Sequence, residues 1–215
     1  MARPSKPKLS TAAIADAALK LVDAHGEFTL PQLAKALSVS ASSLYNHVSG
    51  KDEIIELMRG RAMSAISLPD NASSDWQEIV RQIATSYWES YSRHPRLIPL
   101  LTSHTVRDNT TLRVYDALAE AFAMAGFEPK RRLQAITIVD SFVLGSALDA
   151  AAPALVWEPN AESSRYFKEA LDADLPDSSR PRATFELGLS MLLAAFGQQS
   201  SDRANDAEDG QSRQR

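Results

Sequence analysis

Apolar residues recur along most of the chain at the spacing of one helix face, and no stretch shows the alternation of a half-buried strand. The first such stretch places Ile14, Ala18 and Leu21 on one side, and His25-Gly26 follows it as a stop signal. The most regular stretch comprises Trp76, Ile79, Val80, Ile83, Ala84, Tyr87, Trp88 and Tyr91. The pattern predicts an all-α protein.

The N-terminal part contains two short helices separated by a tight turn. Thr29 can cap a helix whose capping-box partner is Gln32, and Pro31 suits a first turn. Ser38-Val39-Ser40 then separates this helix from one expected over Ala41 to Val48. Such a pair is the helix-turn-helix arrangement, whose second helix enters the major groove of DNA.

The C-terminal part begins after a Pro-, Asp-, Asn- and Ser-rich segment at 68–75. Helices are expected at 112–125, 130–151, 164–173 and 183–196. The helices at 130–151 and 183–196 are apolar on most sides. We expect each to bury one face in its own core and another against a second copy of the chain; the alternative is a helix buried deeply within the monomer. The polar composition after residue 198 predicts a disordered tail.

Composition narrows the class of protein. The chain has 215 residues with 44% hydrophobic and 23% charged side chains, and its apolar runs fall short of the roughly 20 residues that span a membrane. The N-terminus is not followed by the apolar region of a secretory signal. With no cysteine, the chain has no disulfide, cysteine nucleophile or cysteine-held metal. We therefore expect a cytoplasmic protein without a membrane span.

Charge is distributed unevenly along the chain. The net charge is −4, yet residues 1–51 carry six basic and three acidic groups, and the other 164 residues carry 17 basic and 24 acidic groups. Phosphate contacts need a local basic face, which this N-terminal part could supply. The basic arm of Arg3, Lys6 and Lys8 could contact phosphates or the minor groove, or could simply be solvated and disordered.

Several segments resemble the TetR family of bacterial transcriptional repressors. The N-terminal ones are Ile14-Ala15-Asp16-Ala17-Ala18-Leu19, Leu33-Ala34-Lys35-Ala36-Leu37-Ser38-Val39 and Leu44-Tyr45-Asn46-His47-Val48-Ser49-Gly50-Lys51. Phe142-Val143-Leu144-Gly145-Ser146-Ala147-Leu148-Asp149 and Phe185-Glu186-Leu187-Gly188-Leu189 resemble the regulatory domain of tetracycline repressors. The resemblance implies a three-helix DNA-binding domain over 8–68, a helical ligand-binding and dimerisation domain over 69–198, and a tail over 199–215.

The resemblance also implies a homodimeric repressor that leaves a palindromic operator when a small molecule binds. The residues that it places against DNA are Thr29, Ala41, Ser42, Ser43, Tyr45, Asn46, His47 and Lys51. Ser and Asn side chains can bond base edges, whereas Tyr45, His47 and Lys51 suit phosphates. Structural alternatives are that Tyr45 packs against the first helix and that Thr29 only caps its helix.

Ligand-lining candidates are apolar or aromatic residues with a few polar groups among them. They are Ile83, Tyr87, Trp88, Tyr91, Leu101, His104, Leu118, Phe122, Phe142 and Ser146. The same residue types also suit a plain helical core. Against the tetracycline repressor pattern, Ile83 and Leu118 stand where polar tetracycline anchors are expected, so tetracycline is not the expected effector. Ser67 likewise replaces a histidine, while His104 and Asp149 are the nearest counterparts of the metal-side residues.

Two other classes of protein were weighed against a regulator. An enzyme is not expected, because HExxH, ExxH and GxSxG motifs and a glycine-rich phosphate loop are absent from the sequence. An interaction module that no longer reads DNA is disfavoured by Lys51 and by the Tyr45-Asn46-His47 run. No cofactor and no metal site is expected.

Overall fold

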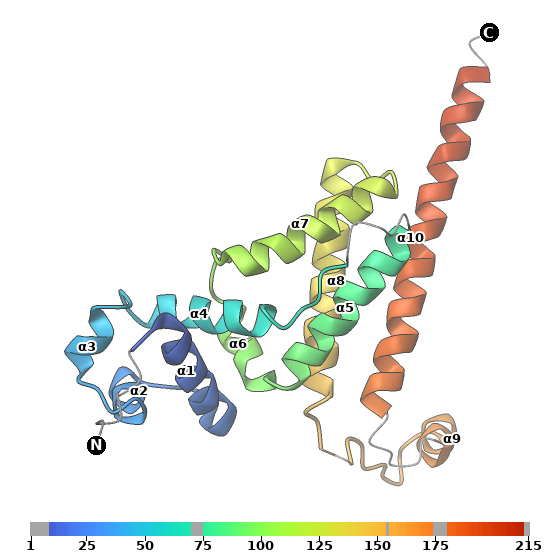
Figure 1. Cartoon of the computed structure of the whole chain (residues 1–215). Coiled ribbons are helices and arrows are strands. Elements are labelled where there is room, and N and C mark those ends of the chain that lie inside the picture. The colour runs from blue at the N-terminus through green and yellow to red at the C-terminus, as the bar shows by residue number, and fades with distance from the viewer. Residues whose placement is uncertain (1–8, 70–74, 154, 174–179, 213–215) are drawn as a thin grey trace.

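The computed structural model describes residues 9–69, 75–153, 155–173 and 180–212, and the regular structure of these residues is entirely helical. The helices are α1 (Thr11–His25), α2 (Leu30–Ala36), α3 (Ala41–Tyr45), α4 (Lys51–Met63), α5 (Trp76–Ser92), the 3₁₀ turn η1 (Pro95–Leu97), α6 (Ile98–Leu101), α7 (Asn109–Met124), α8 (Pro129–Asp149), α9 (Arg165–Ala173) and α10 (Arg180–Ser212) (Figure 1). The all-α class is confirmed. None of the described helices is long and apolar enough to cross a membrane.

Helices α1, α2 and α3 form a head at one end of the molecule (Figure 1). Gly26 ends α1 in the left-handed region at φ 81°. Thr29 and Gln32 form the expected capping box at the start of α2, with each side chain bonded to the other residue's backbone N–H. Ile14, Leu33 and Leu44 are buried between the three helices, so the head has an apolar centre of its own.

Helix α3 is shorter than predicted. It ends at Tyr45 instead of Val48, and residues 46–48 form a turn in which the N–H groups of His47 and Val48 both bond to the carbonyl of Leu44. The early end has a packing reason, because the turn brings Val48 into the core, where it is 3% exposed.

Helix α4 joins the head to a larger bundle of α5, α7, α8 and α10 (Figure 1). It packs against α1 on the head side and against α5, α6 and α7 on the bundle side. A single hydrophobic cluster runs from Ile14 in α1 to Phe196 in α10. The two expected domains therefore share one continuous core through α4.

Helix α10 extends well beyond the expected range of 183–196. It begins at Arg180 and continues through Ser212, into the segment for which composition predicts a disordered tail, and it rises clear of the bundle in Figure 1. Residues 198–212 contain no proline, so no missing backbone N–H interrupts the helix there. Residues 213–215 lie outside the described part, as does the basic arm of Arg3, Lys6 and Lys8.

Helices α8 and α10 each bury one side and expose apolar side chains on another. The buried side of α8 includes Ile136 and Val139, and that of α10 includes Phe185 and Leu193. Their exposed apolar side chains are Leu133 (66%), Ile138 (44%), Leu148 (44%), Leu187 (59%) and Met191 (62%). A monomer therefore does not bury these helices on all sides, contrary to the deeply buried alternative.

A stack of aromatic rings holds α10 against the bundle. The Phe185 ring lies between those of Trp88 and Phe142, with centroid distances of 5.0 and 5.6 Å and nearly parallel planes. Gly188 lies beside this stack, and a Cβ at that position would be 2.7 Å from two ring carbons of Phe142. The glycine therefore lets α10 approach α8 closely.

We predict that Gly188→Val lowers the free energy of unfolding by about 1–3 kcal/mol, because the stacked Phe142 ring cannot move aside freely. The measurement is urea denaturation followed by circular dichroism. Phe142→Leu makes room for the added methyl groups, so the double variant should lose less than the sum of the single variants. Additive losses would contradict this contact, since side chains that do not touch add within about 0.5 kcal/mol.

Candidate DNA-binding surface and effector site

The side chains expected to face DNA lie at the outer surface of the head. Ala41, Ser42, Tyr45, Asn46 and His47 are exposed along α3 and the turn after it, and Ser43 is half-buried. Tyr45 is 56% exposed, so it is not part of the apolar centre of the head. The helix itself is anchored on its inner side by the buried Leu44 and Val48.

Two further candidates mark helix starts next to α3. The Oγ1 atom of Thr29 caps α2 and is bonded to Gln32, so the structural role weighed for Thr29 is present. Lys51 begins α4, is exposed, and has its Nζ 5.3 Å from the centroid of the Phe28 ring. A buried ring thus lies beneath an ammonium group that remains open to an anion.

The backbone geometry of α3 depends on a serine cluster. Ser40 is the N-cap, and its Oγ accepts the backbone N–H of Ser43 at 3.2 Å. The same Oγ lies 2.8 Å from the hydroxyls of Ser42 and Ser43. These bonds fix the first turn of a helix of only five residues, which is too short to be stable by itself.

The ten ligand candidates do not form one group. Ile83, Tyr87, Trp88, Tyr91, Leu101, Leu118 and Phe122 are buried, and His104, Phe142 and Ser146 are half-buried. Trp88 and Phe142 belong to the aromatic stack on α10, whereas Phe122 packs with Trp76, Phe127 and Phe196. Tyr87 and Tyr91 form a third group, with their ring centroids 5.0 Å apart.

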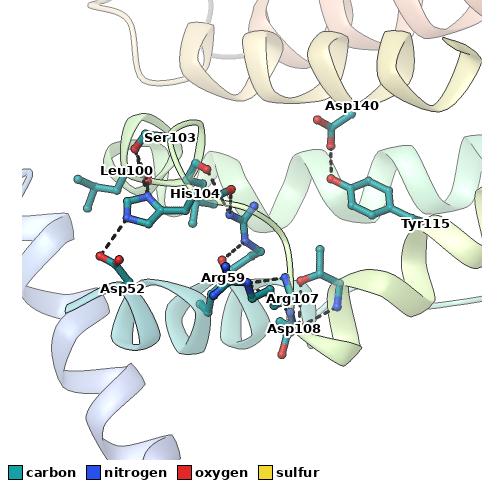
Figure 2. Close-up of polar contacts among 12 residues, drawn as sticks. Asp52, Arg59, Leu100, Ser103, His104, Arg107, Asp108, Tyr115 and Asp140 are labelled. Carbon is teal, nitrogen blue, oxygen red and sulfur yellow. Dashed lines mark hydrogen bonds and ion pairs between the residues drawn. The ribbon is translucent and has the colours of Figure 1, made fainter. Parts of the chain in front are cut away.

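This third group surrounds a carboxylate that was not among the candidates. The hydroxyls of Tyr87 on α5 and Tyr115 on α7 both donate to Oδ1 of Asp140 on α8, each at 2.8 Å. Burial and the neighbouring carboxylate raise the pKa of both tyrosines above their usual value, so both remain donors at neutral pH. Figure 2 shows Asp140 reaching from α8 to Tyr115.

A second polar cluster links α4 to the segment between α6 and α7 (Figure 2). Arg59 is only 6% exposed; its Nε bonds to Glu56 at 2.8 Å, and its Nη2 donates to the carbonyls of Leu101 and His104. The other carboxylate oxygen of Glu56 accepts the backbone N–H groups of Arg107 and Asp108 at 2.8 and 3.2 Å. One ion pair on α4 therefore holds backbone groups of residues 101, 104, 107 and 108, along the whole segment between α6 and α7.

The electrostatics of Glu56 follow from this arrangement. Partial burial alone would raise the pKa of Glu56, but the backbone N–H of Arg107 and the guanidinium of Arg59 together hold that pKa below its usual value. The Glu56 carboxylate therefore stays ionised and keeps its pairing with Arg59 at neutral pH.

Asp140, Tyr115, Arg59 and Glu56 were not among the site residues predicted from the sequence. A signal was available for two of them, because Arg59 falls between the buried Met58 and Ala62 on one helix face, and Asp140 falls between the buried Ile136 and Val143. A charged residue on the buried stripe of an amphipathic helix requires a specific partner. Glu56 is only three residues from Arg59, but the other partners of Arg59 and Asp140 lie 25 to 53 residues away, beyond any local pattern.

The residues nearest to a metal-binding pattern have other partners. The Nε2 atom of His104 lies 3.4 Å from Asp52, and the carboxylate of Asp149 pairs with Arg180 at 3.2 Å. Among the described residues, no group of three or more His, Asp and Glu side chains is placed to hold one ion. With the apolar Ile83 and Leu118 at anchor positions, these residues do not fit a metal–tetracycline complex.

A cavity of about 530 Å³ lies at the junction of the head and the bundle, away from all ten ligand candidates. Asp16, Asp23, Arg61, Arg93 and His94 are among its lining residues. Arg61 forms an ion pair with Asp16 at 2.5 Å, and Nδ1 of His94 is hydrogen-bonded to Asp23 at 2.9 Å, so polar contacts connect α1 to α4 and to the residue before η1.

Comparisons with known proteins place these features in context. Residues 68–198 match the family model described as tetracyclin repressor-like, C-terminal domain. An HTH-type transcriptional regulator of Saccharopolyspora erythraea is 28% identical over 207 residues, which cover 89% of this chain and 86% of that protein. The transcriptional repressor DrrR1 of Streptomyces coeruleorubidus is 26% identical over 151 residues, 67% of this chain and 56% of that repressor. The matched region thus spans just over half of DrrR1.

A solved structure shares the fold over nearly the whole chain. ActR of Streptomyces coelicolor without ligand superposes with a TM-score of 0.74 at 20% identity, covering 91% of this chain and 98% of ActR. ActR in complex with actinorhodin superposes with a TM-score of 0.68 at 20% identity, covering 88% of this chain and 96% of ActR. The likeness shows that both chains have the same fold.

We predict that Glu56→Gln destabilises the protein by about 1–3 kcal/mol at pH 7, because Arg59 stays buried without its carboxylate. The lowered pKa of Glu56 contributes stability above its ordinary value near 4.5 and loses it as the pH falls through the folded-state value. Urea denaturation at pH 7, 5 and 3 should show the gap between wild type and variant closing at low pH. Glu120→Gln, at an exposed site on α7, is the control; a gap of constant size would contradict the prediction.

Proposed function

Because the chain belongs to the TetR family of transcriptional regulators, we propose that it is a homodimeric repressor that binds a palindromic operator and releases it when a small molecule binds the C-terminal domain. The observation that carries the DNA-binding part is the outward row of Ala41, Ser42, Tyr45, Asn46 and His47 on an anchored helix. We place its action in the cytoplasm, where the operator would lie.

The residues of the proposed DNA surface divide into two roles. Asn46 and Ser42 suit base edges in the major groove, and Ala41 suits a thymine methyl group. Lys51, His47 and Tyr45 suit phosphates, and the ammonium of Lys51 stands at the first turn of α4 beside the head. Since α3 contains no arginine, bidentate guanine contacts do not come from this helix.

The exposed apolar side chains of α8 and α10 support the proposed dimer. Leu133, Ile138, Leu148, Leu187 and Met191 belong to these two helices and are each more than 40% exposed. Covering them with the same helices of a second copy gives a two-fold interface, in which each patch faces its own equivalent. In the proposed dimer the two heads would face two operator half-sites about one DNA turn apart or somewhat more.

Helix α4 is the proposed link between effector and head. Its Glu56 and Arg59 hold the backbone around residues 101–108, and its Gly60 lies so close to Asp108, the N-cap of α7, that a Cβ there would be 2.7 Å from the carboxyl carbon. A ligand that displaces the α6–α7 segment would therefore displace α4 and the spacing of the two heads. Such coupling acts through a difference in affinity between two conformations.

The proposed effector site lies among the buried candidates of α5, α7 and α8. Ile83, Tyr87, Tyr91 and Leu118 provide the apolar and aromatic surface that a ligand site needs. Tetracycline is not proposed, because Ile83 and Leu118 would leave its polar edge without partners.

The first test is fluorescence anisotropy of the protein against duplexes from its own upstream intergenic region, with a shuffled duplex as control, at two salt concentrations. We expect selective binding that weakens as salt rises. Lys51→Ala should weaken binding to both duplexes and reduce the salt slope by about one, whereas Asn46→Ala should mainly reduce selectivity. Absence of binding even at low salt would remove the DNA-binding proposal.

A second test addresses the dimer. Replacing Leu187 and Met191 by glutamate places charges in the middle of the proposed interface, so sedimentation velocity should show a monomer where wild type sediments as a dimer. Leu112→Glu, an exposed leucine on α7, is the matched control and should leave the dimer intact. A dimer that survives both charges would place the interface on another surface.

A further inference from the structure

The two oxygens of the Asp140 carboxylate differ in their hydrogen bonds. Its Oδ1 accepts both tyrosine hydroxyls, while none of the described residues donates a hydrogen bond to Oδ2. Among the described residues no lysine, arginine or histidine nitrogen pairs with Asp140, and the nearby Arg59 is engaged by Glu56 and two carbonyls. The carboxylate is half-buried, and Oδ2 is not among the fully buried atoms that lack a partner, so this oxygen stays open to solvent or to a ligand.

A second polar group beside it also lacks a partner. Tyr91 is fully buried, its ring contacts that of Tyr87, and its hydroxyl oxygen has no hydrogen-bond partner among the described residues. A buried hydroxyl oxygen of this kind is normally satisfied by water or by a ligand. The group therefore offers an acceptor on Asp140, a second acceptor on Tyr91 and aromatic rings around both.

An alkylammonium group matches this set of features. It has three N–H donors and no acceptor, so it can bond to Oδ2 of Asp140 and to the Tyr91 hydroxyl together. The electron-rich faces of tyrosine rings attract cations as well. A carboxylate or phosphate ligand would instead be repelled by Asp140, and a neutral alcohol would leave the charge unpaired.

The rest of the effector would meet apolar side chains. Ile83 lies one helical turn before Tyr87 on α5, and Leu118 lies one turn after Tyr115 on α7, so each shares a face with its tyrosine. Both are fully buried. Building on the proposed function, we propose that the effector is an organic amine with an apolar or aromatic body, whose ammonium group binds Asp140 within the tyrosines Tyr87, Tyr91 and Tyr115.

The position of this site also explains how binding of an amine would affect α4. Tyr91 and Tyr115 interact electrostatically with both Asp140 and Arg59, so the tyrosine cluster adjoins the ion pair that holds the α6–α7 segment. A cation placed beside Asp140 adds a positive charge next to the guanidinium of Arg59. The two like charges repel each other, which weakens the hold of α4 on residues 101–108.

The test uses three probes of equal size on the full-length protein at pH 7: 2-naphthylethylamine, 2-naphthylethanol and 2-naphthylacetate. Isothermal titration calorimetry should show the amine binding about tenfold or more tightly than the alcohol, and the acetate least tightly. Equal affinity of amine and alcohol, or absence of amine binding, would overturn the proposal without any variant being needed.

Variants test whether the preference for the amine depends on Asp140 and the tyrosines around it. Asp140→Asn keeps an acceptor for both tyrosines and removes the charge, so the amine should bind no better than the alcohol. Asp116→Asn makes the same change at an exposed site of α7 and should keep the full preference. If Asp140→Asn does not fold, Tyr115→Phe removes one bond that orients the carboxylate and should reduce the preference several-fold. An undiminished preference in Asp140→Asn, or in Tyr115→Phe where Asp140→Asn does not fold, would overturn the assignment.

Operator binding is measured on the same proteins and separates the two proposals. Asp140→Asn should bind the operator like wild type, and the amine should release only wild type. Failure of wild type to bind any operator would remove the proposed function, while the calorimetric preference would still decide whether Asp140 binds amines. Amine binding at Asp140 without operator release would show a ligand site that is not the effector site.

Discussion

The whole molecule depends on one buried ion pair, that of Arg59 and Glu56 on α4. A guanidinium that is almost completely buried must have its donors satisfied, and here the acceptors are Glu56 and the carbonyls of Leu101 and His104. Leaving such a buried donor without its carboxylate costs about 1–3 kcal/mol. That requirement fixes where α4 lies on the bundle, and the position of α4 in turn decides where the head points.

The packing of α4 also couples the head to the bundle, so a shift of α4 moves both. Its apolar residues Ile54, Ile55 and Met58 are packed into the core that runs from the head to the bundle, so the helix cannot shift within one half alone. Close-packed interiors respond to displacement by changing between discrete arrangements, because intermediate positions leave voids or clashes. The ion pair of Asp16 with Arg61 and the hydrogen bond of Asp23 with His94 add polar contacts that tie the same head to α4 and to the segment before η1.

Patterns among neighbouring residues predicted the helices well. They did not predict features that depend on residues far apart in the sequence. The capping box at Thr29, the stop at Gly26 and the period of α5 depend on neighbours within four residues, and all three are present in the structure. The end of α3 depends on burying Val48, and the site residues Asp140 and Arg59 depend on partners on other helices. Their charges on buried stripes could have been noticed from the sequence, but the identity of their partners could not. The aromatic candidates were divided among three groups because helical spacing gives a buried face without saying which helix covers it.

The serine cap of α3 separates the stability of the head from the chemistry of its surface. Ser40, Leu44 and Val48 hold the helix, whereas Ala41 and Asn46 are exposed and have no side-chain hydrogen bond among the described residues. Exposed substitutions of this kind usually change stability by less than about 0.5 kcal/mol. Over evolutionary time such positions can vary almost without a folding penalty, so related chains could differ along the proposed DNA surface while keeping the same core and the same junction of head and bundle.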